Sequence, residues 1–190
     1  MIGTAFMNWR DQRPDDAMVG AFDAYAPPIV KAVGAGPFRE AMSRYGAAVH
    51  VITTDGPSGK GGVTATAVCS VSDDPPTLLV CVNRKSQTGQ TIANNGVFCV
   101  NTLNAESEEL ANLFAGRTGV ASAARFDTGS WGSLTTGSPV FASAICACDC
   151  RVVEINAVGS HNVIFGVVEA VNLGPNVPAL VYHGRSYKTV

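Results

Sequence analysis

Beyond residue 36, the chain is dominated by short runs in which apolar and polar residues alternate or β-branched residues cluster. Such runs are typical of β-strands, whose side chains point alternately to two faces. The turn-forming segment 55–62, rich in Gly, Asp and Pro, predicts that the strands on either side of it form a hairpin. The pattern predicts strands over residues 49–54, 63–72, 77–83, 97–103, 140–158, 162–173 and 179–183.

Helical spacing of apolar residues is confined to a few short segments. It predicts helices over residues 38–45, 87–94 and 107–114. Residues 115–139, rich in Gly, Ser and Thr, are predicted to form a long loop. Many antiparallel strands with few short helices indicate a mainly β fold, a closed or half-closed barrel.

The start of the chain has a different character. Prolines and glycines interrupt any long pattern in residues 1–36, which we interpret as an N-terminal arm with one short helix near residues 15–25. Residues 37–190 are then predicted to form a single domain.

Composition narrows the class of protein. Of the 190 residues, 46% are hydrophobic and only 15% are charged, which favours a folded chain that covers part of its apolar surface with a second copy. The net charge of −2 and the lack of basic clusters argue against nucleic acid as a partner. No apolar run approaches the roughly 18 residues of a membrane helix, and no export signal is recognisable, so we expect a cytoplasmic protein without a membrane partner.

The segment 62–72 is the most informative candidate for a binding site. If it is one strand, Thr64, Thr66, Ser70 and Ser72 form a row of hydroxyls on one face, with small apolar residues on the other. Such a row can donate hydrogen bonds to a phosphate or to a planar ligand. Periodicity alone favours the simpler interpretation, a half-buried strand with a hydroxyl-rich outer face.

A second candidate lies at residues 83–88, where a buried strand gives way to a helix. Arg84, Lys85, Ser86 and Thr88 supply two cations and two hydroxyls, and the free N–H groups of a helix start suit a phosphate. The alternative is a turn in which Ser86 caps the helix. Both interpretations can hold at once.

The remaining candidates carry weaker signals. His161, in the turn 159–161, could contact a dinucleotide or simply be solvated, and His50 is predicted to pack within its strand. Cysteines 69, 81, 99, 146, 148 and 150 are interpreted as reduced core residues, and the spacing of the last three does not favour a metal site. No nucleophile elbow, Rossmann fingerprint or Walker loop is found.

Taken together, the sequence resembles the short-chain flavin reductases, the reductase components of two-component flavin-dependent monooxygenases. The resemblance spans about residues 37–190, and its most specific part is the Thr-Ala-Thr-Ala stretch 64–67 followed by the Pro-Pro strand. The matching segments are 38–42, 51–54, 62–72, 75–81, 98–101, 114–116, 159–161 and 185–187.

The resemblance implies a homodimeric split β-barrel that binds FMN or FAD and uses NADH or NADPH as hydride donor. Carried over by position, the expected ring-lining residues are Thr64, Ala65, Thr66 and Ala67, with Phe114 near the ring edge. The expected nicotinamide-side residues are His161 and Tyr187. Those expected near the flavin phosphate are Ser70, Arg84, Lys85, Ser86 and Thr88, and Asn83 and Arg185 are further expected cofactor-binding residues.

The implied reaction is hydride transfer from the nicotinamide to the flavin, with reduced flavin supplied to a partner monooxygenase. Since the cofactors carry this chemistry, no catalytic side chain and no metal are expected. Two alternatives remain open. The flavin could stay bound and reduce another acceptor, such as a corrinoid or a metal chelate, or the domain could bind flavin without turnover.

Overall fold

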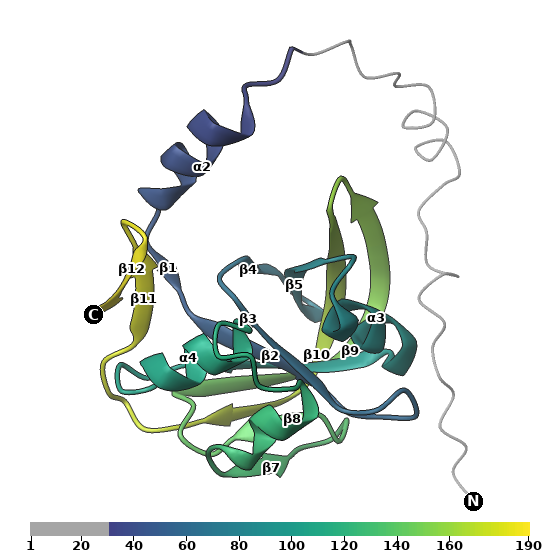
Figure 1. Cartoon of the computed structure of the whole chain (residues 1–190). Coiled ribbons are helices and arrows are strands. Elements are labelled where there is room, and N and C mark those ends of the chain that lie inside the picture. The colour runs from purple at the N-terminus through teal and green to yellow at the C-terminus, as the bar shows by residue number, and fades with distance from the viewer. Residues whose placement is uncertain (1–30) are drawn as a thin grey trace, which may run out of the picture. The chain divides into compact units, whose positions relative to one another are not determined.

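The computed structural model of the chain describes residues 31–190, and its largest element is an antiparallel sheet of seven strands (Figure 1). β9 and β10 form the long central hairpin, and β3 and β4 are the two edges. In spatial order the strands are β3 (Gly61–Ala65), β2 (His50–Thr54), β6 (Val97–Thr102), β9 (Cys146–Val158), β10 (His161–Leu173), β5 (Pro76–Asn83) and β4 (Val68–Asp73).

Smaller elements surround this sheet. The helices α3 (Gln87–Asn95) and α4 (Glu108–Phe114) both contact β2 and β3. No helix within residues 31–190 is long and apolar enough to cross a membrane. The smaller elements are the sheet β1 (Ala47–Ala48), β11 (Leu180–His183) and β12 (Ser186–Thr189), the pair β7 (Trp131–Ser133) and β8 (Pro139–Phe141), the helices α2 (Ala35–Ser43), α3 (Gln87–Asn95) and α4 (Glu108–Phe114), and the 3₁₀ helix η2 (Ala123–Asp127).

The predicted fold class is confirmed, with differences in detail. The described residues form a mainly β structure with short helices, and its sheets are not closed. The predicted strand 140–158 is wrong, because the chain turns between β8 and β9. The turn residue Ala144 is fully buried, so the turn does not interrupt the apolar pattern. The predicted loop 115–139 contains η2 and β7.

The first 38 residues make up a separate unit from residues 39–190. The predicted helix near residues 15–25 lies outside the described residues, as does most of the predicted arm. The arm therefore remains a prediction.

The predicted strand 63–72 is two strands, β3 and β4, at opposite edges of the large sheet. The two residues between these strands are Thr66 and Ala67, and we call them the edge link. The sheet curls enough for β3 to contact β5, and the Cys81 N–H donates to the carbonyl oxygen of Ala67 at 3.0 Å. A break of two residues leaves a period of two unchanged, which is why alternation did not reveal it.

Both faces of β2 are buried, so the core lies on two sides of this strand. Val51 belongs to a cluster with α4, β8 and β11, whereas Ile52 belongs to a cluster inside the curled sheet with β5, β6 and α3. Phe114 anchors the first cluster and Phe98 the second, and both are almost fully buried.

Asn101 is a buried polar residue that joins three strands. Its Nδ2 donates to the carbonyl oxygen of Val51 and to Oγ1 of Thr53, each at 3.1 Å, and to the carbonyl oxygen of Pro139 at 3.3 Å. Its Oδ1 accepts from the Phe141 N–H at 2.8 Å. β2, β6 and β8 are thereby tied through one fully buried side chain.

All six cysteines are free thiols, but they are not all core residues. Cys99 and Cys150 are buried as predicted, whereas Cys69 is exposed because β4 is an edge strand. The Sγ atoms of Cys146 and Cys148 lie 3.9 Å apart. The hydrogen bond from Cys148 lowers the pKa of Cys146 to about 7, and burial raises the pKa of Cys150 to about 12.

These pKa shifts predict an order of thiol reactivity. The thiolate is the nucleophile, so alkylation of Cys146 by iodoacetamide should rise steeply as pH passes through 7, ahead of Cys148, Cys150 and Cys99. Peptide mass spectrometry over pH 6–9 measures this. Cys148→Ala removes the donor and should shift the midpoint for Cys146 upward. An unchanged midpoint in that variant would show that Cys148 does not stabilise the thiolate.

Candidate active site

Two adjoining pockets border the end of β3. Thr64, Ala65 and Thr66 contribute to both of them. The pocket that is also lined by Asn83, Ser86 and His161 has a volume of about 270 Å³, and we call it the phosphate-side pocket. The pocket that is also lined by Tyr182 and Tyr187 has a volume of about 190 Å³, and we call it the tyrosine-side pocket. Each is below the roughly 300 Å³ at which small-molecule sites begin, so two substrates the size of nucleotides would have to extend along both pockets and into solvent.

The phosphate-side pocket is built around the start of α3. Ser86 caps this helix, accepting from the Gly89 N–H at 3.0 Å, and its hydroxyl donates to the carbonyl oxygen of Asn83 at 2.8 Å. The predicted cap is therefore confirmed. The backbone N–H groups of Gln87 and Thr88 have no hydrogen-bond partner among residues 31–190. Free N–H groups at a helix start form a ready-made anion site.

The edge link supplies further unpaired donors. Neither the Thr66 N–H nor the Ala67 N–H bonds to any group within the described part of the chain, because these two residues belong to neither ladder. Both residues are exposed, and the Thr66 hydroxyl lacks a partner in the same range. The link therefore presents small side chains and free donors, which suits the polar edge of a planar ring.

The structure brings together half of the residues predicted from the sequence. Those that line the phosphate-side pocket are Thr64, Ala65, Thr66, Ala67, Asn83, Ser86 and His161. Of the predicted residues, Tyr187 lines the tyrosine-side pocket with Thr64, Ala65 and Thr66. Those that line neither pocket are Ser70, Arg84, Lys85, Thr88, Phe114 and Arg185.

Several of these side chains bond within the protein instead. The Thr88 hydroxyl donates to the carbonyl oxygen of Gly62 at 3.1 Å, and Arg84 Nη1 to that of Gly159 at 3.3 Å. Arg185 pairs with Glu40 at 2.8 Å.

The predicted row of four hydroxyls is wrong, because its members lie on opposite edges of the sheet. Thr64 donates to the carbonyl oxygen of Ala111 at 2.6 Å, whereas Ser72 bonds to the backbone of Asp74. Of the four, only Thr64 and Thr66 border the pockets.

The Phe114 ring packs against β3, the strand whose end borders both pockets. The ring is buried against Phe126 and Trp131, with centroid separations of 5.1 and 5.5 Å. A Cβ at Gly62 would lie 2.5 Å from this ring, so β3 can pass over it only with glycine there.

The three histidines have different environments. His161 lines the phosphate-side pocket, with Nδ1 2.9 Å from Oγ of Ser160, and so does not share a pocket with Tyr187. His50 packs within its strand as predicted, and burial lowers its pKa to about 4. His183 is exposed and lines neither pocket.

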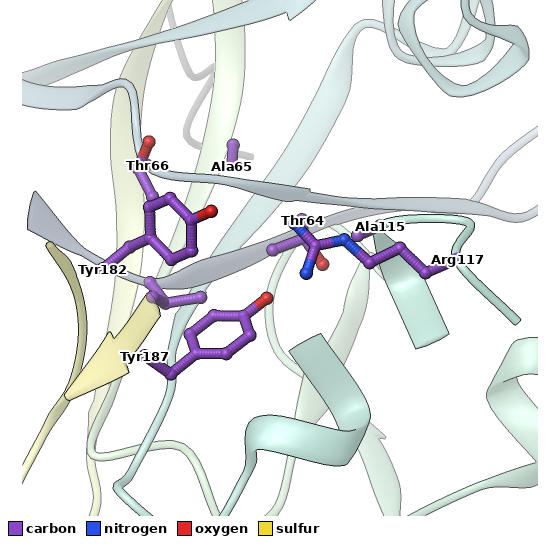
Figure 2. Close-up of a pocket in the computed structure, with 8 residues that line it drawn as sticks. Thr64, Ala65, Thr66, Ala115, Arg117, Tyr182 and Tyr187 are labelled. Atoms are coloured by element: carbon purple, nitrogen blue, oxygen red, sulfur yellow. The ribbon is translucent and has the colours of Figure 1, made fainter. Parts of the chain in front are cut away.

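The tyrosine-side pocket contains residues that sequence reasoning missed. Val49, Ala115, Arg117 and Tyr182 line it together with Tyr187, and Figure 2 shows the Arg117 guanidinium near Thr64 and facing the Tyr187 hydroxyl. The Tyr182 and Tyr187 rings pack edge to face at 5.3 Å. Arg117 could have been found from the sequence, because it directly follows the matched segment 114–116. Tyr182 could not, because only the pairing of β11 with β12 places it beside Tyr187.

These pockets can hold an anionic, planar ligand. The Ser160 hydroxyl lies beside Nδ1 of the lining residue His161, but Ser160 itself lines neither pocket. Within residues 31–190, no three His, Cys, Asp or Glu side chains are grouped to bind a metal ion. Small side chains at residues 65 and 67 leave room for a ring face, and the free N–H groups at 66, 67, 87 and 88 suit a ring edge and a phosphate. A flavin phosphate and isoalloxazine ring therefore fit the residues present.

Comparison with known proteins shows the family to which this chain belongs. Residues 42–190 match the family model described as a flavin reductase like domain. The chain is 52% identical over 158 residues to an FMN reductase (NADH), RutF 1, of Methylorubrum extorquens, covering 83% of this chain and 78% of the relative.

Solved structures of flavin reductases have the same fold as this chain. BorF, the flavin reductase component of a bacterial two-component tryptophan halogenase, superposes with a TM-score of 0.77 at 28% identity, covering 83% of this chain and 98% of that one. A Haemophilus somnus protein assigned as a flavin reductase gives a TM-score of 0.80 at 41% identity, covering 83% and 100%.

The class is therefore that of the split-barrel flavin reductases, which are oxidoreductases. The chain belongs to the flavin reductase like family. The family resemblance found in the sequence is confirmed.

Proposed function

We propose that this protein is an NADH-dependent FMN reductase that supplies reduced flavin to a partner oxygenase. The observation that carries the proposal is the placement, around one pocket, of N–H groups that have no partner in the described part of the chain. The edge link offers two N–H groups in the pocket lining. The start of α3 offers two more, on Gln87 and Thr88, which follow the lining residue Ser86 but do not themselves line the pocket. FMN has a polar ring edge and a terminal phosphate, and the RutF relative is named an FMN reductase that uses NADH.

The residues of this chain bind and orient rather than react. A bound flavin supplies the hydride acceptor and the nicotinamide supplies the hydride. The N–H groups of Thr66 and Ala67 would donate to the ring edge, and those of Gln87 and Thr88 to the phosphate. His161 would contact the bound ligand, since it lines the same pocket. Holding the flavin and nicotinamide rings with their reacting atoms aligned lowers the barrier to hydride transfer.

The proposal of a partner oxygenase rests on weak binding of the flavin. The pocket offers hydroxyls and backbone N–H groups, and neither Arg84 nor Lys85 lines it. Ligation of this kind suits a flavin that leaves after reduction. BorF, with the same fold, is the reductase component of a two-component enzyme.

We also propose a homodimer. β4, β9 and β10 expose large apolar side chains, among them Val71, Val158, Val171 and Leu173, the last 79% exposed. Such surface is typical of an interface between copies. Light scattering should then give about twice the 19.7 kDa of one chain.

Anaerobic stopped-flow absorbance tests the proposed function. With FMN in large excess over protein, NADH should bleach the whole flavin band, because each protein molecule turns over many times. Bleaching limited to one flavin per chain would indicate a bound prosthetic group and another acceptor. No bleaching with either NADH or NADPH would leave a flavin-binding domain without reductase activity.

A further inference from the structure

Arg117 places a cation in the tyrosine-side pocket, separate from the donors at the start of α3. The left-handed Gly116 (φ 75°) ends α4, and the Arg117 N–H returns to the carbonyl oxygen of Asn112 at 3.3 Å. The guanidinium then lies at the pocket, where Figure 2 shows it facing the Tyr187 hydroxyl. The location of this charge is thus set by the end of a helix.

The charge of Arg117 is available to a ligand. One donor, Nη1, bonds to Oδ1 of Asn112 at 3.0 Å, and no carboxylate within residues 31–190 forms a salt bridge with it. A guanidinium has five N–H donors, so most remain free. Burial raises the pKa of Tyr187, and the positive charge of Arg117 opposes that rise, which is consistent with the closeness of the two groups.

The rest of the tyrosine-side pocket suits a flat ring. Tyr182 and Tyr187 stand beside each other on β11 and β12, and Val49 and Ala115 complete an apolar lining. The pocket shares Thr64–Thr66 with the phosphate-side pocket, so ligands in the two would meet at the end of β3. A reaction between two anionic substrates with planar rings needs such an arrangement.

We propose that Arg117 binds a phosphate of the nicotinamide dinucleotide and is a specificity-determining residue for the hydride donor. This inference rests on the proposed function, because it takes the flavin phosphate to lie at the α3 start. Two substrates that each carry phosphate need two anion sites, and Arg117 supplies a second cationic site in the pocket that adjoins the phosphate-side pocket at Thr64–Thr66. Fork-like donors make Arg well suited to phosphate oxygens.

The test compares a hydride donor that carries the diphosphate and adenosine of the dinucleotide with one that carries neither. In Arg117→Ala, the KM for NADH should rise about 10- to 100-fold, as expected for a lost hydrogen bond to a charged group. The KM for dihydronicotinamide riboside, which has no phosphate, should stay unchanged, as should the KM for FMN. Arg117→Lys should recover part of the loss. Arg44→Ala, which removes an exposed cation in a weak surface pair, is the matched control.

A binding titration makes the inference independent of turnover. Calorimetry with NAD⁺ should show a similar 10- to 100-fold weakening in Arg117→Ala, whereas nicotinamide riboside should bind the variant and the wild type alike. If the wild type reduces no flavin, the proposed function fails, and this titration still decides the role of Arg117.

Three results would overturn the inference. Unchanged NADH and NAD⁺ constants would show that Arg117 contacts no donor phosphate. Equal loss for all donors would show that it only shapes the pocket. A rise in the KM for FMN but not for riboflavin would assign it to the flavin phosphate.

Discussion

Replacing Ala67 with tryptophan is expected to abolish flavin reduction while the protein stays folded. Ala67 is exposed and lines the phosphate-side pocket, so an indole there would fill the space proposed for the ring. Misplacing reacting atoms by about 1 Å can cost about 100-fold in rate, so blocking the ring should cost at least that much. Stability should change by about 0.5 kcal/mol or less, since the backbone carbonyl that accepts from Cys81 is retained.

Steady-state turnover of FMN and urea denaturation, measured on the same preparation, check this expectation. Ala93→Trp is the control, because Ala93 is an exposed alanine on α3 and lines neither pocket. Ala67→Gly should retain activity, since it leaves the pocket open. Wild-type turnover in Ala67→Trp would place the flavin somewhere other than at the edge link.

The largest loss of stability is expected for Asn101→Ala. The change removes all the hydrogen bonds through which Asn101 ties β2, β6 and β8, and it leaves the Phe141 N–H without its acceptor in the core. An unsatisfied buried group costs about 1–3 kcal/mol, and each of the other lost hydrogen bonds adds about 1 kcal/mol. We expect the free energy of unfolding to fall by about 3 kcal/mol or more.

Urea denaturation followed by circular dichroism measures the change. Asn156→Ala, which removes an exposed amide bonded only to Glu154, should cost less than about 0.5 kcal/mol. If Asn101→Ala does not fold, Thr53→Val removes one partner of the amide and should cost about 1 kcal/mol. An Asn101→Ala protein as stable as the wild type would show that water replaces the lost bonds.

Local signals predicted many of the elements closely. β5 and α3 begin and end within one residue of their predicted bounds, and Ser86 caps α3 as expected. These elements are defined by their own residues, through a buried strand, a capping hydroxyl and a left-handed Gly96. The β2–β3 hairpin likewise follows from the turn signals of residues 55–62.

Tertiary features were less predictable. The curl of the sheet divides the segment 63–72 between two edges, and no property of that segment alone reveals it. The tyrosine-side pocket combines residues of β11, β12 and the end of α4, which are far apart in the sequence. Thr88 and Arg84 have the chemistry of phosphate ligands, yet the fold turns both toward backbone carbonyls.

The edge link also bears on the order in which the molecule assembles. Its flanking strands pair at opposite edges of a seven-stranded array, so the link reaches its native position only once β3 has paired with β2 and β4 has paired with β5. Closing the gap between residues adjacent in sequence adds little loop entropy. A folding intermediate containing only one half of the array would have no ring-binding surface, because that surface exists only where the two ends meet. Capture of flavin during refolding would therefore report that the β2–β3 and β4–β5 pairs have both formed, rather than either hairpin alone.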